Sequence, residues 1–275
     1  MKRLSSPEIK AIELGIMKEL DRICTEHGLR YSLAYGTALG AVRHGGFIPW
    51  DDDIDVFMPR PDYERLWDLC SKQTSGTYRL ISYRDKSSIY HFFKMVDTRT
   101  TSYETFVGKK YPTGLWVDIF PLEPVEGVSE KDLARARSRQ RRVGLVRSFA
   151  VADATTASNR AALVAKKVVC PLAHHLNPYR LAETLDNMGL EVASKAVDQH
   201  DEGPWLDLLG SNALIDGRLI FPTQTLKFED TTFQGPARAE DYLAQEYGDW
   251  RKTPPIEERA VHFPEAYLLD EAAHL

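Results

Sequence analysis

Apolar residues spaced by three and four positions near the start of the chain predict a long helix. The preceding Ser6-Pro7-Glu8 is typical of a helix start, because it offers a capping serine, a proline in the first turn and an acidic residue beside them. Gly28 is expected to end the helix. The apolar face of this helix comprises Ile9, Ile12, Ile16, Leu20 and Ile23.

The remaining pattern mixes short strands with helices. Strands are predicted over residues 29–35, 54–58, 78–83, 88–96, 116–120, 226–229 and 231–233. Helices are predicted over 37–43, from 61 onward, over about 129–190 and over 239–247. This order predicts an α+β protein, with a core over 1–128, a helical insertion over 129–210 that binds the acceptor, and C-terminal elements over 211–275 that return to the core.

Four aspartates surround the start of the strand predicted over 54–58. Asp53 and Asp55 are two residues apart, so both side chains project from one face, while Ile54 and Val56 anchor the other face. Neighbouring carboxylates repel each other unless a cation lies between them, and Mg²⁺ prefers such oxygen ligands. A solvated acidic turn remains an alternative. A calcium loop fits poorly, because its sixth position requires Gly and holds Val56.

Gly36-Thr37 follows a predicted strand and opens a predicted short helix. A helix N-terminus offers unpaired N–H groups to a phosphate, glycine permits close backbone approach and the threonine hydroxyl adds a donor. Ordinary helix capping is the alternative. Because the Asp-x-Asp pair of Asp53 and Asp55 follows in the sequence, phosphate binding is favoured over ordinary capping.

The whole run from Tyr35 to Val56, YGTALGAVRHGGFIPWDDDIDV, resembles the signature of the LicD family. Further blocks similar to that family are Phe93-Lys94-Met95-Val96-Asp97, the run 116–122, Tyr247-Gly248-Asp249-Trp250 and Pro254-Pro255. The resemblance implies a nucleotidyltransferase fold, namely a mixed sheet flanked by helices, with its catalytic core in residues 1–128. It is weakest in the predicted insertion.

The resemblance also implies a reaction. A CDP-linked alcohol, typified by CDP-choline, would donate its phosphorylated headgroup to a hydroxyl of a cell-surface glycan or a lipid-linked precursor, releasing CMP with the help of Mg²⁺ or Mn²⁺. Transfer of glycerol phosphate or of a nucleotide is an alternative within the same fold. A non-catalytic nucleotide- or metal-binding module is an alternative from another class, against which the intact acidic residues stand.

Residues of this sequence that match the family pattern supply the expected site. Asp53, Asp55 and Asp118 are the expected catalytic and metal-binding residues, although Asp118 would alternatively cap the turn before Pro121. The expected substrate-binding residues are Gly36, Thr37, Arg43, Trp50 and Lys94.

Three of these substrate-binding residues have other interpretations. Lys94 is alternatively an outward-facing strand lysine, Arg43 a partner of an aspartate, and Trp50 a core residue. His262 is a weaker candidate. A choline headgroup would also call for an aromatic cage. The tyrosines available for such a cage are Tyr31, Tyr83, Tyr90, Tyr103 and Tyr111.

Charge and cysteine content limit the possible binding partners and the cellular compartment. The net charge of −5 argues against a nucleic-acid partner. Three isolated cysteines, no secretory leader and no apolar run of membrane-spanning length predict a cytoplasmic protein. Residues 131–147 nevertheless hold seven basic side chains and only one acid, Asp132. We expect this stretch either to be a solvated helix surface or to attract an anionic acceptor or the anionic inner face of the membrane.

Overall fold

A computed structural model describes residues 1–73, 76–104, 107–153, 155, 160–197, 200–255, 259 and 265–270. The predicted first helix is α1 (Ser6–His27), and Gly28 ends it in the left-handed conformation with φ 61°. The cap lies one residue earlier than predicted. The backbone N–H of Ser5 donates to Glu8 Oε2 at 2.9 Å, so Ser5 and Glu8 close the first turn together.

The central element is a mixed sheet, which confirms the predicted α+β class. Its strands lie in the order β2 (Ser32–Leu33), β3 (Asp55–Pro59), β7 (Trp116–Pro124), β5 (Phe93–Asp97) and β4 (Tyr78–Ile81). Only β3 and β7 in this path run parallel. The far end of β7 also pairs with β8 (Pro204–Asp207), which pairs with β9 (Ala213–Asp216).

Smaller elements complete the core. One small sheet has the order β1 (Lys2–Arg3), β12 (Glu265–Leu268) and β6 (Thr100–Tyr103), and a hairpin joins β10 (Gln224–Phe228) to β11 (Thr231–Gly235). The helical elements are α2 (Tyr35–His44), α3 (Arg60–Cys70), a 3₁₀ turn (Tyr83–Asp85), α7 (Gly217–Ile220) and α8 (Ala239–Tyr247).

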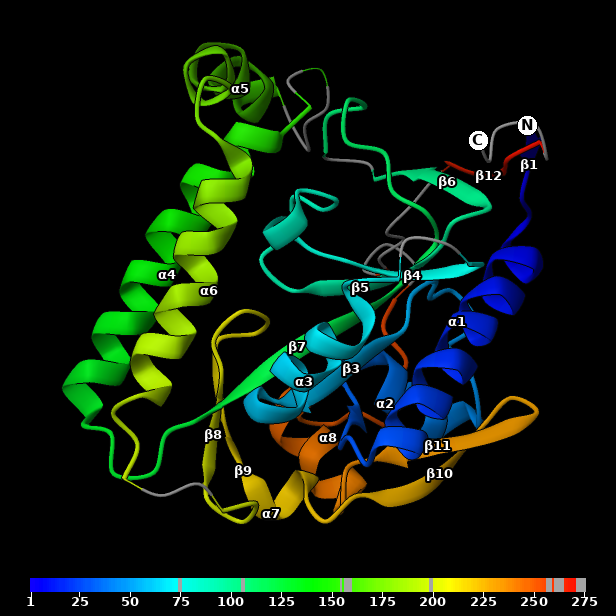
Figure 1. Ribbon diagram of the computed structural model, residues 1–275, viewed down its shortest axis with the longest axis vertical. Coiled ribbons are helices and arrows are strands. Elements are labelled where there is room, and N and C mark those ends of the chain that lie inside the picture. The colour runs from blue at the N-terminus through cyan, green and yellow to red at the C-terminus, as the bar shows by residue number, and fades with distance from the viewer. Residues whose placement is uncertain are drawn as a thin grey trace.

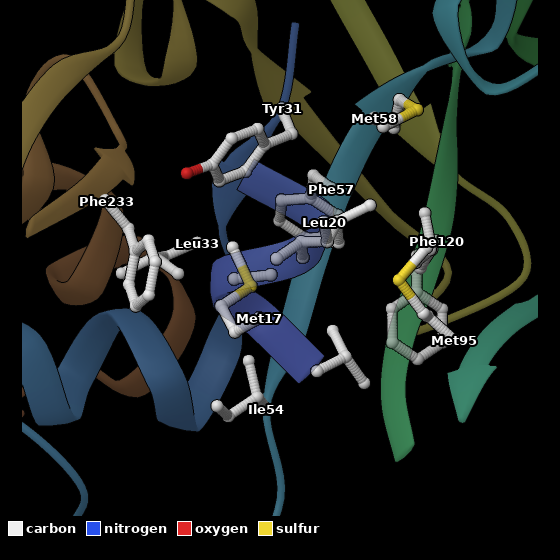
Figure 2. Packing of buried hydrophobic residues seen from close by; sticks show 14 of the residues in the cluster. Met17, Leu20, Tyr31, Leu33, Ile54, Phe57, Met58, Met95, Phe120 and Phe233 are labelled. Atoms are coloured by element: carbon white, nitrogen blue, oxygen red, sulfur yellow. The ribbon is translucent and has the colours of Figure 1, made fainter. Parts of the chain in front are cut away.

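The two faces of the sheet carry different side chains. On one face, Phe93 stacks on Tyr63 of α3 with 3.8 Å between ring centroids. On the opposite face, Tyr35 packs edge-on against Phe57 and Phe120. Figure 2 shows the buried cluster in which α1 contributes Met17 and Leu20 and the strands contribute side chains such as Phe57. The apolar face predicted for α1 is therefore packed against the sheet.

The predicted insertion forms three helices, α4 (Glu130–Val151), α5 (Arg160–Ala173) and α6 (Pro178–Ala193). Helices α4 and α6 lie side by side, and α5 lies at their far end (Figure 1). The helical part is shorter than the predicted 129–210, because residues 204–207 form β8 and hydrogen-bond to β7. No helix in the described ranges is both long and apolar enough to cross a membrane.

A buried charge network joins this helical layer to the core. Arg60 of α3 donates to Glu123 of β7 at 3.0 Å and lies 2.8 Å from Asp186 of α6. Asp186 also accepts from the hydroxyl of Tyr83 at 2.6 Å. Since burial of any one of these charges alone would be costly, the network fixes α6 against the sheet.

Candidate active site

The parallel pairing of β3 and β7 brings two of the predicted acidic residues together. Asp55 and Asp118 are Cα partners in this register, so their side chains project from the same face of the sheet. Lys94 of β5 is the partner of Asp118 on its other side. The backbone N–H of Asp118 donates to the carbonyl oxygen of Ile54 at 2.9 Å, which fixes this register at the start of β3.

Lys94 is a buried partner of Asp118. Its ammonium lies 2.8 Å from Asp118 Oδ1 and 3.9 Å from Glu104 Oε1, and its side chain is 1% exposed. The rings of Trp116 and Tyr90 lie 3.9 and 4.2 Å from the same ammonium. The alternative that Lys94 is an outward-facing strand lysine is therefore wrong, and its predicted contact with a phosphate stays a prediction.

The carboxylate of Asp118 is held inside the protein rather than at a turn. The indole N–H of Trp116 donates to Asp118 Oδ2 at 3.1 Å, while Lys94 occupies the other oxygen. Burial raises the pKa of Asp118 to about 6 against the opposing effect of Lys94, and the negative charges of Glu104 and Asp53 add to the increase. Asp118 thus shares one electrostatic environment with Asp53 as well as with Asp55.

Gly36 and Thr37, at the start of α2, contact residues 51–55, which are called the acidic loop below. The backbone N–H of Asp55 donates to Thr37 Oγ1 at 2.8 Å, so the hydroxyl fastens α2 to β3. A Cβ added at Gly36 would lie 2.6 Å from Asp51 Oδ2, so only glycine allows Asp51 to approach this closely. Both residues therefore position the aspartates, and their predicted phosphate contacts stay predictions.

Arg43 and Trp50 connect the acidic loop to the C-terminal segment. Arg43 donates to the carbonyl oxygen of Trp250 at 2.8 Å, so part of its guanidinium is already engaged. The Trp50 ring has the guanidinium of Arg43 at 6.0 Å and that of Arg259 at 4.0 Å. Trp50 is half-buried against the core, as the alternative interpretation anticipated. His262 lies outside the described residues.

Two further residues at the acidic loop were not predicted. Glu13 of α1 is 0% exposed, and within the described structure neither of its carboxylate oxygens has a hydrogen-bond partner. Lys10, one turn earlier, donates to the carbonyl oxygen of Ile48 at 3.0 Å, which places this part of α1 beside the loop before the aspartates. Burial raises the pKa of Glu13 well above its ordinary value, and the charges of Asp53, Asp52 and Asp51 raise it further.

Tyr247 is the second unpredicted residue. It ends α8, and the residue is 43% exposed. Burial raises its pKa, and the charges of Glu246, Asp55, Asp51 and Asp53 contribute to the increase. The sequence block Tyr247-Gly248-Asp249-Trp250 was the only signal for it. Tyr247 therefore lies within the electrostatic influence of the same aspartates.

Replacing Glu13 gives a direct stability test. Because the folded-state pKa of this acid is raised above its ordinary 4.5, the folded chain binds more protons than the unfolded chain above that pH, and stability falls as pH rises. We expect Glu13→Met to raise the free energy of unfolding by about 1–3 kcal/mol. Urea unfolding should show a larger gain at about pH 8 than at about pH 4. An equal gain at both pH values would contradict the assignment of the raised pKa.

The five tyrosines considered for an aromatic cage around a cationic headgroup do not all lie together in the structure. Tyr90 and Tyr111 line one cavity of about 130 Å³, together with Tyr179 of α6. The other tyrosines lie elsewhere: Tyr31 donates to Asp21, Tyr83 donates to Asp186, and Tyr103 lies on β6.

Cations of the chain already lie over two of the cavity's rings. Lys94 and Arg147 lie 4.2 and 5.0 Å from the Tyr90 centroid, and Lys110 lies 4.8 Å from that of Tyr111. Because a quaternary ammonium would be repelled by these charges, the cavity suits hydroxyl-bearing or anionic groups better than choline.

The basic stretch predicted over 131–147 is not one surface. Arg147 is buried and donates to the carbonyl oxygen of Ile89 at 3.0 Å, so its place in a surface patch was wrong. The buried guanidinium supplies that carbonyl oxygen with hydrogen-bond donors. Arg139 pairs with Glu191 at 3.0 Å and is exposed, as are Arg135, Arg141 and Arg142.

The acidic residues fit a divalent cation chemically. Within the described ranges, no group of three or more His, Cys, Asp or Glu side chains is already arranged to hold a metal ion. Mg²⁺, however, commonly takes only one or two protein carboxylates and completes its shell with water and substrate phosphates. Asp53 and Asp55 offer two hard oxygen donors beside Asp118, and their mutual repulsion favours a cation between them.

Comparison with known proteins identifies the family of this chain. A family model described as LicD/FKTN/FKRP, nucleotidyltransferase domain, matches residues 28–146. The chain is 30% identical over 277 residues to the lipopolysaccharide cholinephosphotransferase LicD of Haemophilus influenzae, with 98% of this chain and 100% of that protein covered. It is 29% identical over 105 residues to the human ribitol 5-phosphate transferase FKRP, which covers 38% of this chain and 19% of that protein. The chain therefore belongs to the LicD family.

Proposed function

We propose that this protein is a metal-dependent phosphotransferase with a nucleotidyltransferase fold. In the proposed reaction, a phosphorylated alcohol moves from a CDP-linked donor to a hydroxyl of a glycan or a lipid-linked glycan, and CMP is released. The observation that carries the proposal is the pairing of Asp55 with Asp118 on one face of the sheet, next to Asp53. The full-length similarity to a cholinephosphotransferase supports the reaction class.

Each residue has a physical role in this proposal. Asp53 and Asp55 would hold Mg²⁺ or Mn²⁺, which when bound neutralises the donor phosphates. Thr37 and Gly36 keep Asp55 and Asp51 in place through the contacts described above. An acceptor hydroxyl attacks the phosphorus distal to the cytidine, the phosphorus–oxygen bond to CMP breaks, and the electron pair leaves with CMP. Asp118, with its raised pKa, is the candidate acceptor of the hydroxyl proton.

The headgroup is a finer part of the proposal. Phosphocholine is the first candidate, because of the relative that aligns over nearly the whole chain. The cations over Tyr90 and Tyr111 favour a polyol phosphate such as ribitol or glycerol phosphate instead, if the headgroup enters the cavity beside Tyr90. The three free and buried cysteines are consistent with the proposed cytoplasmic location.

A thermal-shift experiment tests donor and metal together. CDP-choline, CDP-ribitol and CDP-glycerol are added to the purified protein with and without Mg²⁺ or Mn²⁺. We expect one donor to raise the melting temperature, by mass action, only when the metal is present. CMP release with that donor, followed by phosphorus NMR, then tests turnover. Donor binding with no CMP release under any acceptor would favour the non-catalytic binding module.

A further inference from the structure

Large apolar side chains gather on the surface of the helical layer. Thirteen large hydrophobic side chains are exposed in the described ranges, and seven of them belong to α4, α5 and the turn after α5. These seven are Leu145, Val146, Val164, Val168, Val169, Leu172 and Leu176. Helix α5 lies at the far end of α4 and α6, away from the central sheet (Figure 1). The exposed apolar side chains are therefore concentrated at this end of the helical layer, which is called the tip below.

One face of α5 holds the most exposed of these residues. Val164, Val168 and Leu172 repeat every four positions and are 64%, 66% and 74% exposed. The opposite side of the helix is already packed, since Cys170 and Ala173 are buried. Packing of α5 onto its neighbours thus leaves this apolar face uncovered by the part of the chain that the structure describes.

Basic residues lie on the same helices as the exposed apolar residues. The α5 sequence contains Lys166 and Lys167 but no acidic residue, and Lys167 is exposed. On α4, Arg141 and Arg142 are exposed close in sequence to Leu145 and Val146. The protein as a whole carries a net charge of −5, so this positive tip is a local departure. An apolar face accompanied by basic residues is the pattern of helices that lie in the headgroup region of a membrane.

The positive charge of α5 also distinguishes between two possible binding partners of the apolar face, a second copy of the chain and a lipid bilayer. If a second copy of the chain docked on α5 face to face, the Lys167 side chains of both copies would approach one another, and like charges across an interface disfavour association. A bilayer with anionic headgroups instead offers complementary charge to the basic side chains and hydrocarbon to the apolar face.

We propose that the apolar face of α5, together with Lys167 on the same helix and the exposed Arg141 and Arg142 of α4, docks this protein on the surface of an anionic lipid bilayer. The surface differs from the basic stretch predicted from sequence, because its centre is apolar and lies on α5. Docking is independent of the proposed transfer reaction, so it can be measured without any substrate. Docking would hold the protein at the surface on which membrane-held acceptors are presented.

Vesicle sedimentation with the full chain tests the inference. Wild-type protein should sediment with phosphatidylcholine vesicles that contain phosphatidylglycerol, and much less with phosphatidylcholine alone. Val168→Gln combined with Leu172→Gln should weaken binding to the anionic vesicles by about tenfold or more. Lys167→Glu should weaken it mainly at low salt, since the charge contribution is screened. Glutamine suits an exposed helix position, so the double variant should keep the wild-type melting temperature.

Matched substitutions elsewhere serve as controls. Leu190→Gln on α6 and Val197→Gln also replace exposed apolar side chains, and both variants should bind vesicles like the wild type. Three results would overturn the inference: no binding of the wild type to anionic vesicles, equal loss in the control variants, or unchanged binding in the double variant. Conversion of a dimer to a monomer by the double variant, seen by analytical ultracentrifugation, would assign the face to a second copy and also overturn it.

Discussion

Asp55→Asn and Asp53→Asn are each expected to lower turnover by at least about 10²–10³-fold, because each removes negative charge that the reacting phosphates need through a bound cation. The fold should remain intact. Asp55 is held by its backbone, whose N–H donates to Thr37 Oγ1 and whose carbonyl oxygen accepts from Ala34 at 3.0 Å, and asparagine keeps both bonds. Steady-state CMP release under saturating metal measures the loss, and circular dichroism checks the fold.

Asp230→Asn is the matched control for this experiment. Asp230 is an exposed acid that pairs with Lys18 at 2.9 Å, away from β3 and β7, so its replacement should leave turnover unchanged. The metal-dependent part of the donor thermal shift should disappear in the Asp55 variant and remain in the Asp230 variant. Wild-type turnover in either of the two site variants would remove those aspartates from the active site.

Local periodicity predicted the elements whose signal lies within a single stretch of sequence. The apolar face of α1, its end at Gly28, the helix α8 and the mixed α+β class were all confirmed. Short strands such as β1, β6 and β12 were missed. Each has only two to four residues, and pairing with distant segments, rather than local pattern, stabilises them.

The active-site prediction likewise succeeded where the signal is local in sequence and failed where it depends on contacts between distant segments. Alternation predicted that Asp53 and Asp55 share one strand face, but β3 begins only at Asp55, so Asp53 lies before the strand. The family resemblance indicated Asp118, but the register that pairs Asp118 with Asp55 joins residues 63 positions apart in sequence. Glu13 escaped prediction because it is a single acid within an amphipathic helix, where an acid normally faces solvent. Arg147 was misplaced for the same reason, since one arginine in a basic run gives no sign that it is buried.

Lys94→Met is expected to destabilise the protein by about 3–5 kcal/mol, because it leaves Asp118 buried without its cation. Asp118→Leu should lower the free energy of unfolding by a similar amount, because it leaves the buried ammonium of Lys94 without its carboxylate partner. The double variant replaces both charges by apolar groups, so its loss should fall short of the sum of the two single losses by about 1–3 kcal/mol. Urea unfolding of the four proteins gives this coupling energy. Lys227→Met, on the exposed edge of β10, is the control and should change stability little.

The same pair predicts how turnover depends on pH. Lys94 lowers the pKa of Asp118, so its removal should raise that pKa above about 6 and leave the carboxyl protonated over a wider range of pH. Turnover of Lys94→Met should therefore be low near neutral pH and recover as pH rises, because the ionised fraction of Asp118 increases. Asp118→Asn has no group to ionise and should stay inactive throughout. If the acid limb of the pH–rate profile of Lys94→Met coincides with that of the wild type, Lys94 does not control the protonation of Asp118, and its role is a direct substrate contact or packing alone.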